Sequence, residues 1–358
     1  MKCAVFHDYF GAVGGGEKVA LVIAQALDAD IITTDTDCLE KFGCNIPVMS
    51  LGETPKIPPI KQTTAVNRFS SCDFSYDYDF FIFSGNWAHH ASDKHHPNLW
   101  YCHTPVRAFY DLYQILLQRQ SYLRRQAFRL WVYRHRHLDQ QAVSHIDKIV
   151  TNSQNTLGRI KRYYQRDAVI IYPPVDTSQF SCKEYGDYWL SVNRLYPEKR
   201  IELQIEAFRE MPDERLVIVG GYALGDHAKN YALRLYENLP ANVEIRGEIT
   251  SEELSELYAT CKGFVTTALD EDFGMTPVEA MASGKPVVAV REGGYKESVV
   301  DGVTGFLVDA DVPSLVKAMR VVSKNPEQYR KACIQRSRLF DICFFKEKIK
   351  DQVRSLLE

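Results

Sequence analysis

Two glutamates eight positions apart, Glu271 and Glu279, flank a glycine-containing loop that leads into a helical pattern. The amides at Gly274–Thr276 would open that helix, where free backbone N–H groups attract phosphate or sugar oxygens. Glu279 is placed to accept hydrogen bonds from a diol, whereas a glycosidase would use such a carboxylate pair as acid and nucleophile. Alternatively, Glu279 only stabilises its helix N-terminus and Glu271 is solvated. Because that alternative leaves the loop unexplained, we favour ligand binding.

A basic turn follows the strand predicted at Tyr188–Val192. Its Arg194 and Lys199 are five positions apart, and an arginine fork together with a flexible ammonium can neutralise a diphosphate. Alternatively, the basic residues only form a solvated turn without a ligand, and we expect this for Arg200. For Arg194 and Lys199 we prefer the phosphate role, since ligands of α/β folds bind at the carboxyl ends of strands.

Two further candidates lie in the first half of the chain. The loop Gly11–Gly16 follows a strand and opens a helix, so the amides of Gly15 and Gly16 could approach an anion. An ordinary tight turn explains that loop equally well. His103 directly follows the strand predicted at Leu99–Cys102, and this position suits a ligand-binding histidine as well as a structural one.

The histidine and cysteine patterns do not indicate a metal site. His89, His90, His95 and His96 form an HHxxxxHH pattern, which matches neither HExxH nor a zinc finger. The nine cysteines are scattered and never form CxxC, which disfavours a disulfide framework or a zinc ribbon and is typical of the reducing cytosol. We therefore expect no metal and no cofactor.

The stretch 107–137 carries seven arginines against a single acidic residue, Asp111, with aromatic residues interleaved. A basic aromatic helix of this kind can lie on an anionic membrane face or hold a phosphorylated lipid. It could also be a core helix with a solvated basic back. We favour membrane contact.

Short apolar runs alternate with longer helical patterns, which predicts buried parallel strands joined by helices. The expected strands are Cys3–Phe6, Ile31–Thr34, Phe80–Ser84, Leu99–Cys102, Lys148–Asn152, Tyr188–Val192, Arg215–Val219, Val243–Arg246, Gly263–Thr267 and Pro286–Val290. The expected helices are Glu17–Leu27, Ile201–Glu210, His227–Asn238, Ser251–Thr260 and Pro277–Ala282. The second half thus repeats the architecture of the first.

A length of 358 residues is too great for one ordinary core and suits two domains. Two adjacent prolines, Pro173 and Pro174, cannot sit inside a central strand or helix, so we place a hinge there. The expected domains are 1–170 and 171–336, followed by a terminal helix over 337–358. Its expected apolar stripe consists of Phe344, Phe345, Ile349, Val353 and Leu356.

Composition excludes several classes of protein. Apolar residues make up 45% and charged residues 25%, which excludes a disordered, collagenous or coiled-coil chain. A net charge of -3 gives no global sign of a nucleic-acid binder. No apolar run of about 18 residues occurs. We expect a cytoplasmic protein that binds no nucleic acid and does not span a membrane.

Taken together, these motifs resemble the large family 4 of retaining glycosyltransferases. The resemblance runs through nearly the whole chain, in the segments GGGEKV, CHTP, IIYPPVDTSQF, RLYPEK and EDFGMTPVEAMASGKPVV, and in Gly293–Gly294 leading to Glu297. It implies the α/β GT-B fold, in which two Rossmann-like domains with parallel sheets face a central cleft. It also implies sugar transfer from a nucleotide diphosphate sugar to an acceptor, with retained configuration and without a metal.

The resemblance assigns roles to the candidate residues by position. Arg194 and Lys199 would hold the diphosphate and Glu279 the ribose. The sugar hydroxyls would be held by Glu271 together with Phe273, Gly274, Met275 and Thr276. Gly15 and Gly16 would approach the phosphate from the other domain, His103 would lie near the transferred sugar, and Ile249 would flank the base. Where many relatives have glycine, this chain has Arg200, which could alter the local turn.

The stretch CHTPVRAFYDLY is most similar to bacterial and archaeal mannosyltransferases that build O-antigen or other lipid-linked polysaccharide from GDP-mannose. This implies a polyprenyl-diphosphate glycan as acceptor at the cytoplasmic membrane face, in the N-terminal domain. A UDP-sugar-dependent transferase and a sugar-nucleotide epimerase of the same fold stay open. A nicotinamide dehydrogenase is disfavoured because a strict GxGxxG is absent, and a non-catalytic sugar-nucleotide binder is disfavoured because Arg194, Lys199, Glu271 and Glu279 are all present.

Overall fold

The computed structural model describes residues 1–358 except 12–13, 44 and 223–228. Contacts divide the chain into two compact units, one formed by Met1–Tyr172 with Phe345–Glu358 and the other by Pro173–Phe344. The chain passes from the first unit to the second between Tyr172 and Pro173, the first of the two adjacent prolines at which the hinge was expected. It returns to the first unit for its last helix.

The first unit contains a parallel sheet of seven strands in the order β3-β2-β1-β4-β5-β6-β7. The strands are β1 Cys3–His7, β2 Asp30–Thr33, β3 Val48–Ser50, β4 Phe80–Ser84, β5 Asn98–Cys102, β6 Lys148–Thr151 and β7 Val169–Ile170. The helices are α1 Gly15–Leu27, α2 Ile60–Ser71, α3 Tyr113–Gln118, α4 Tyr122–Ser144, α5 Gln154–Tyr164 and α13 Ile342–Leu357, with short 3-10 turns η1 Leu39–Phe42 and η2 Ala88–Lys94.

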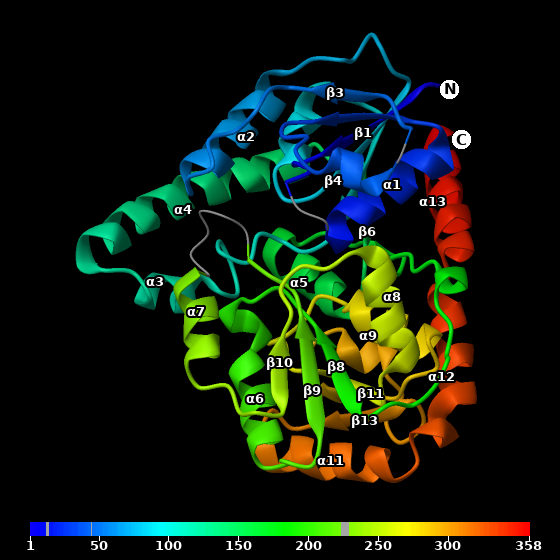
Figure 1. The fold of residues 1–358 in the computed structure, drawn as a ribbon. Coiled ribbons are helices and arrows are strands. Elements are labelled where there is room, and N and C mark those ends of the chain that lie inside the picture. Colours follow the sequence, from blue (N-terminus) through cyan, green and yellow to red (C-terminus); the bar gives the residue numbers. More distant parts are fainter. Residues whose placement is uncertain (12–13, 44, 223–228) are drawn as a thin grey trace. The chain divides into compact units, whose positions relative to one another are not determined.

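The second unit contains a parallel sheet of six strands in the order β10-β9-β8-β11-β12-β13, and β8, β9 and β11 are seen side by side in Figure 1. The strands are β8 Tyr188–Val192, β9 Arg215–Val219, β10 Val243–Ile245, β11 Gly263–Thr266, β12 Val287–Val290 and β13 Gly305–Val308. The helices are α6 Ile201–Arg209, α7 Lys229–Glu237, α8 Ser251–Thr260, α9 Met275–Ala282, α10 Tyr295–Ser298, α11 Val312–Lys324 and α12 Arg330–Ser337, with η3 Thr177–Gln179, η4 Pro197–Lys199, η5 Pro326–Tyr329 and η6 Arg338–Phe340.

The α/β fold with two parallel sheets is the one predicted from the sequence. Strands such as β4 are buried at every position, because helices cover both faces of a parallel sheet. The core of the first unit is rich in aromatic rings. The ring of Phe6, for example, packs against those of Phe81 and Phe83.

The end of the chain differs from the expectation. Instead of one helix over 337–358, α12 ends at Ser337 and α13 begins at Ile342 after a 3-10 turn. Phe345, Ile349 and Val353 are buried as predicted, but Phe344 is 50% exposed and does not belong to the apolar stripe. Among the described residues no helix is both long and apolar enough to cross a membrane.

Candidate functional site

In the second unit, the candidate residues gather where the chain reverses direction across its sheet. From β8 the chain continues to β9 on one side, and only later adds β11 on the other side of β8. The carboxyl ends of two such strands form the crevice in which α/β proteins bind ligands. Arg194 and Lys199 follow β8, and Glu271 follows β11, so the fold brings these residues to one end of the sheet.

Lys199 and Glu271 are in direct contact, with 2.5 Å between Nζ and Oε2. Their side chains are 27% and 20% exposed, so this ion pair stays accessible to a ligand. The Lys199 carbonyl accepts a hydrogen bond from Thr267 Oγ1 at 2.9 Å, which ties the turn η4 to the end of β11. An ammonium held in this way can exchange its carboxylate for a phosphate oxygen. The sequence predicted both residues at the site, but not their pairing.

Gly274 gives the loop its conformation. Its φ of 85° is one that side chains rarely adopt, and a Cβ there would lie 2.6 Å from Cε1 of Tyr295. Gly274 caps α9, which begins at Met275, two residues before the expected start at Pro277. Met275 and Thr276 are therefore the first helical residues, whose amides have no partner within the helix.

Phe273 plays a different part from the one expected. Its side chain is only 2% exposed and packs on Phe340, with 5.3 Å between ring centroids. The ring thus anchors the loop in the core, and only the backbone of Phe273 can serve a ligand.

Glu279 lies on α9 beyond its first turn and is 7% exposed. Its Oε2 accepts a hydrogen bond from the hydroxyl of Tyr258 at 2.8 Å. Burial, followed by the nearby Glu279 charge, raises the pKa of Tyr258 well above its usual range, so the phenol keeps its proton and donates. This position excludes the alternative that Glu279 only stabilises the helix N-terminus. Tyr258 had no signal in the sequence that distinguished it from a core tyrosine.

Ile249 follows β10, whose carboxyl end lies at the same edge of the sheet, and is partly exposed. The next residue, Thr250, begins α8 with a capping box that it forms with Glu253. The capping box thus fixes the backbone beside Ile249.

The expectation for Arg200 was wrong. Its side chain is 22% exposed, and the guanidinium donates from Nε to the Thr267 carbonyl at 2.7 Å and pairs with Glu292. Its φ of 49° is a left-handed conformation, which glycine adopts with less strain than arginine. Arg200 is therefore a structural residue of the site loops rather than part of a solvated turn.

In the first unit, the glycine loop and the candidate histidine are neighbours. Helix α1 begins at Gly15, and a Cβ at Gly16 would lie 3.9 Å from Nε2 of His103. That distance is an ordinary contact, so the loop approaches the imidazole closely without excluding a side chain at position 16. Residues 12–13 of the predicted loop lie outside the described residues.

His103 is held without charge at neutral pH, because burial lowers its pKa to about 4. Its Nε2 contacts Ser84 Oγ at 3.0 Å, and its carbonyl accepts a hydrogen bond from Asn152 at 2.8 Å. Nearby, burial lowers the pKa of His7 to about 3, with a smaller contribution from the His103 charge. A neutral imidazole can donate or accept a hydrogen bond but cannot neutralise a phosphate.

Asp8 was not predicted, yet it organises the same end of this sheet. The buried carboxylate accepts hydrogen bonds from the amides of Asn86, Trp87 and Ala88 at 2.6, 2.7 and 2.8 Å. A Cβ at Gly85 would lie 2.4 Å from the Asp8 carboxyl carbon, so glycine is needed there. The aspartate after β1 and the glycine after β4 were visible in the sequence, but their pairing across 77 positions was not.

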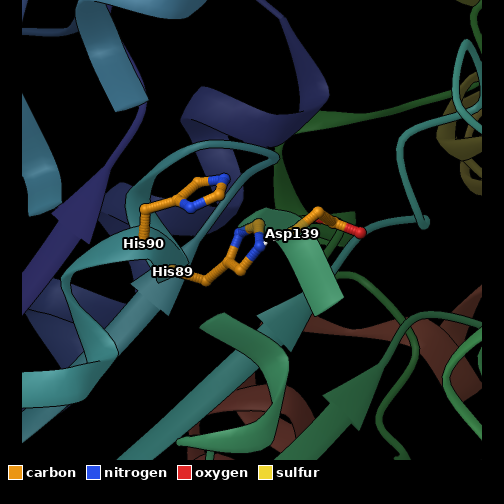
Figure 2. Close-up of side chains that lie close together, drawn as sticks. All are labelled: His89, His90 and Asp139. Atoms are coloured by element: carbon orange, nitrogen blue, oxygen red, sulfur yellow. Dashed lines mark hydrogen bonds and ion pairs between the residues drawn. The ribbon is translucent and has the colours of Figure 1, made fainter. Parts of the chain in front are cut away.

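Two of the four histidines in the HHxxxxHH pattern, His89 and His90, cluster with Asp139. Figure 2 shows the side chains of His89 and Asp139 turned toward one another, with the His90 ring beside that of His89. His89 Nε2 lies 3.1 Å from Asp139 Oδ1, and the other carboxylate oxygen accepts hydrogen bonds from two tyrosines, Tyr110 and Tyr164. The carboxylate is thus already satisfied by the protein.

The geometry of this cluster also does not favour a shared metal ion. The rings of His89 and His90 are only 32° from parallel, with centroids 4.6 Å apart. Because the nitrogen lone pairs lie in the ring planes, nearly parallel rings do not direct them to one point. His89 and Asp139 belong to a hydrogen-bonded network inside the first unit, with the His90 ring packed beside His89, and the absence of a metal stays a prediction.

The basic stretch 107–137 divides into inner and outer arginines. Arg107 pairs with Asp111 at 2.8 Å, Arg125 donates to three backbone carbonyls, and Arg136 donates to the Phe109 carbonyl. The remaining members on α4, Arg124, Arg129 and Arg134, are exposed. Only part of the predicted basic surface is therefore available.

Comparison with known proteins links the second unit to glycosyl transferases. Residues 178–340 match the family described as Glycosyl transferases group 1. The chain is 27% identical over 223 residues to an uncharacterized glycosyltransferase of Methanocaldococcus jannaschii, which covers 62% of each chain. It is 28% identical over 295 residues to an alpha-1,3/1,6-mannosyltransferase of Candida glabrata, which covers 65% of this chain and 61% of that protein. The chain thus spans less than two thirds of the length of these relatives.

Solved structures agree on the fold. The structure of Anabaena HepE in complex with UDP and glucose has a TM-score of 0.80 at 19% identity, and covers 98% of this chain and 99% of its own. The structure of sucrose-phosphate synthase from Thermosynechococcus elongatus has a TM-score of 0.77 at 18% identity. The match covers 100% of this chain and 99% of that one. Together with the two parallel sheets, these likenesses show a GT-B fold, and residues 178–340 of the second unit resemble the group 1 glycosyl transferases.

Proposed function

We propose that the protein is a retaining glycosyltransferase that moves a hexose from a nucleotide sugar to a lipid-linked or polysaccharide glycan, with GDP-mannose as the favoured donor. The observation that carries the proposal is the Lys199–Glu271 ion pair. It lies at the carboxyl ends of β8 and β11, where the strand order of the second sheet reverses, and Glu271 belongs to the loop that leads into α9. The relatives named alpha-1,3/1,6-mannosyltransferase support mannose as the sugar.

In this proposal the residues act by binding and orientation. Lys199 and Arg194 neutralise the diphosphate, whose negative charge increases as the sugar leaves. Glu271 and the amides after Gly274 hold the sugar hydroxyls, and Glu279 holds the ribose. The acceptor hydroxyl attacks on the same face that the phosphate leaves, and its proton passes to that phosphate. No covalent bond to the protein forms, so Glu271 orients the sugar and does not attack it.

A uridine donor is the second candidate. HepE of Anabaena, whose structure in complex with UDP-glucose matches this chain with a TM-score of 0.78, supports it. Binding and slow hydrolysis should be measured for GDP-mannose, UDP-glucose and UDP-N-acetylglucosamine with a chelator present. Selective binding of GDP-mannose with release of GDP is the expected result. Selective use of a UDP sugar would overturn the donor, and failure of all three to bind would overturn the transferase proposal.

The acceptor end of the proposal includes contact with an anionic membrane. Four large apolar residues of α4 are 71% to 79% exposed, namely Tyr122, Leu123, Leu130 and Tyr133. At about 100° per residue they fall on one side of the helix. Arg129 and Arg134 flank that side, so apolar and cationic groups are presented together, as membrane-surface helices present them.

Vesicle sedimentation tests this contact. We expect the protein to sediment with vesicles containing anionic lipid, and the double variant Leu130→Glu, Tyr133→Glu to stay in solution. Leu339→Glu is the matched control, because it also adds a charge at an exposed leucine but lies in the second unit. Equal sedimentation of wild type and the double variant would exclude this surface.

A further inference from the structure

The side chain of Arg200 joins two loops of the site in the second unit. Nε donates to the carbonyl of Thr267 at 2.7 Å, and Nη2 donates to that of Ala268 at 3.3 Å. Both carbonyls belong to the segment that leaves β11 and leads to Glu271. The Arg200 side chain is only 22% exposed, so water replaces these contacts poorly.

Glu292, which follows β12, completes the arrangement. It accepts from Arg200 in bidentate fashion, at 3.1 Å to Oε1 and 2.8 Å to Oε2. Oε2 also accepts from the backbone N–H of Asp270 at 3.2 Å, directly before Glu271. Bidentate arginine–carboxylate pairs fix geometry as well as charge. One carboxylate therefore ties the guanidinium to the backbone next to Glu271.

The backbone on the other side of Glu271 is held by the residues after Glu292. The N–H of Gly294 donates to the Glu271 carbonyl at 2.8 Å. A Cβ at Gly293 would lie 2.2 Å from that carbonyl oxygen, so the two loops pack backbone against backbone. Asp270 itself has a left-handed φ of 47°, a conformation that surrounding contacts must maintain.

We infer that the Arg200–Glu292 pair positions Glu271 for the transferred sugar. Neither residue is assigned contact with substrate: they act through the loop, and the inference rests on the proposed donor site. Lysine cannot replace Arg200, because a single ammonium lacks the planar fork that reaches two carbonyls and both carboxylate oxygens. Glu279 accepts its hydrogen bond from Tyr258, which is not a member of this pair, and we therefore expect nucleoside diphosphate binding and sugar orientation to separate.

The test uses the full chain with Glu292→Gln, Arg200→Lys and the double variant Arg200→Lys, Glu292→Gln. We expect kcat to fall about 10- to 100-fold in each, because misplacement by about 1 Å costs on that order. Affinity for GDP and UDP, measured by calorimetry, should change less than about threefold. The double variant should be no worse than the poorer single variant, since both substitutions break one unit.

A second readout does not depend on turnover. Hydrogen exchange at amides 269–274 and 293–295 should accelerate in Glu292→Gln. Asp213→Asn is the matched control, because Asp213 forms a bidentate pair with Arg320 in the same unit without contacting the site loops. This control should change neither kcat nor exchange at those amides.

The outcomes separate the inference from the proposed function. Wild-type kcat and unchanged exchange in Glu292→Gln would overturn the positioning role while leaving the transferase proposal standing. If the wild type turns over no nucleotide sugar, the proposed function fails, and the exchange measurement still decides whether the pair positions the loop. Loss of GDP and UDP affinity equal to the loss of kcat would show a general structural role and would also overturn the inference.

Discussion

The two units place different chemistry at the same architectural position. In the second unit, the strand ends carry a charged pair, Lys199 with Glu271, that remains partly exposed. In the first unit, the strand ends carry His7 and His103, which burial keeps neutral. The two parallel sheets therefore present different side chains at their strand ends. In the proposed function, the charged pair of the second unit serves the diphosphate, and the histidines of the first unit form uncharged hydrogen bonds.

Removal of the charged pair should have the largest effect. Lys199→Ala and Glu271→Ala should each reduce turnover by about 10³-fold, because each removes a group that meets developing charge or orients the sugar. Steady-state kinetics with the donor found in the panel measures this. Lys183→Ala is the control, since Lys183 forms an exposed ion pair with Glu256 in the same unit. Turnover above a tenth of wild type would remove the role assigned to either residue.

Weakening the ribose contact should have an intermediate effect. Glu279→Gln should raise the donor KM about 10- to 100-fold, the range expected for a lost hydrogen bond to a charged group. Tyr258→Phe should raise KM less, because it removes only the hydroxyl that orients the Glu279 carboxylate. If Tyr258→Phe is the more harmful change, the tyrosine does more than orient Glu279.

The neutral histidines should make stability depend on pH. The folded-state pKa of His103 lies at about 4, below the ordinary value of 6.5, so the folded state takes up this proton less readily than the unfolded state. Its stabilising contribution is complete above pH 6.5 and is lost as pH falls from 6.5 toward 4. The slope is about 1.4 kcal/mol per pH unit for each such group.

Thermal unfolding between pH 7 and pH 5 measures this contribution. His103→Gln should lower the midpoint less steeply with acid than wild type does, since glutamine has no proton to gain. His96→Gln is a suitable control, because His96 pairs with Asp147 at the surface. Parallel curves for wild type and His103→Gln would contradict the buried neutral imidazole.

The smallest effect, none at all, is expected from removal of metal ions. The Asp139 carboxylate is satisfied by His89 and two tyrosines, and cationic side chains serve the proposed diphosphate. The turnover rate and the midpoint temperature of thermal unfolding should therefore be unchanged after dialysis against a chelator. Stoichiometric zinc in the purified protein, together with loss of stability on its removal, would show that the histidine cluster binds metal.

The fold could be predicted because most of its strands are recognisable in the sequence as short apolar runs. Buried runs such as Phe80–Ser84 and Arg215–Val219 coincide with strands at both ends, since both faces of a parallel sheet are covered. β3 was missed because its three residues, Val48–Ser50, are exposed at the sheet edge and form no apolar run. The start of α9 was misplaced because Gly274, rather than Pro277, decides it.

The contacts within the site were less accessible to sequence reasoning. Motif spacing predicted that Lys199 and Glu271 share a site, but a spacing cannot show that they touch. Arg200 was misjudged because its partner Glu292 lies 92 positions away and follows a different strand. Side-chain partners across a sheet depend on strand order, which local patterns do not specify.

The second crossing of the chain between the units has a consequence for synthesis. Tyr101 of β5 packs on Phe345, with 5.7 Å between ring centroids, and Lys148 of β6 donates to Ser355 in α13. These partners leave the ribosome only after all of the second unit has been made. The unit that begins the chain is therefore the last to be completed, and until then its β5 and β6 lack part of their cover.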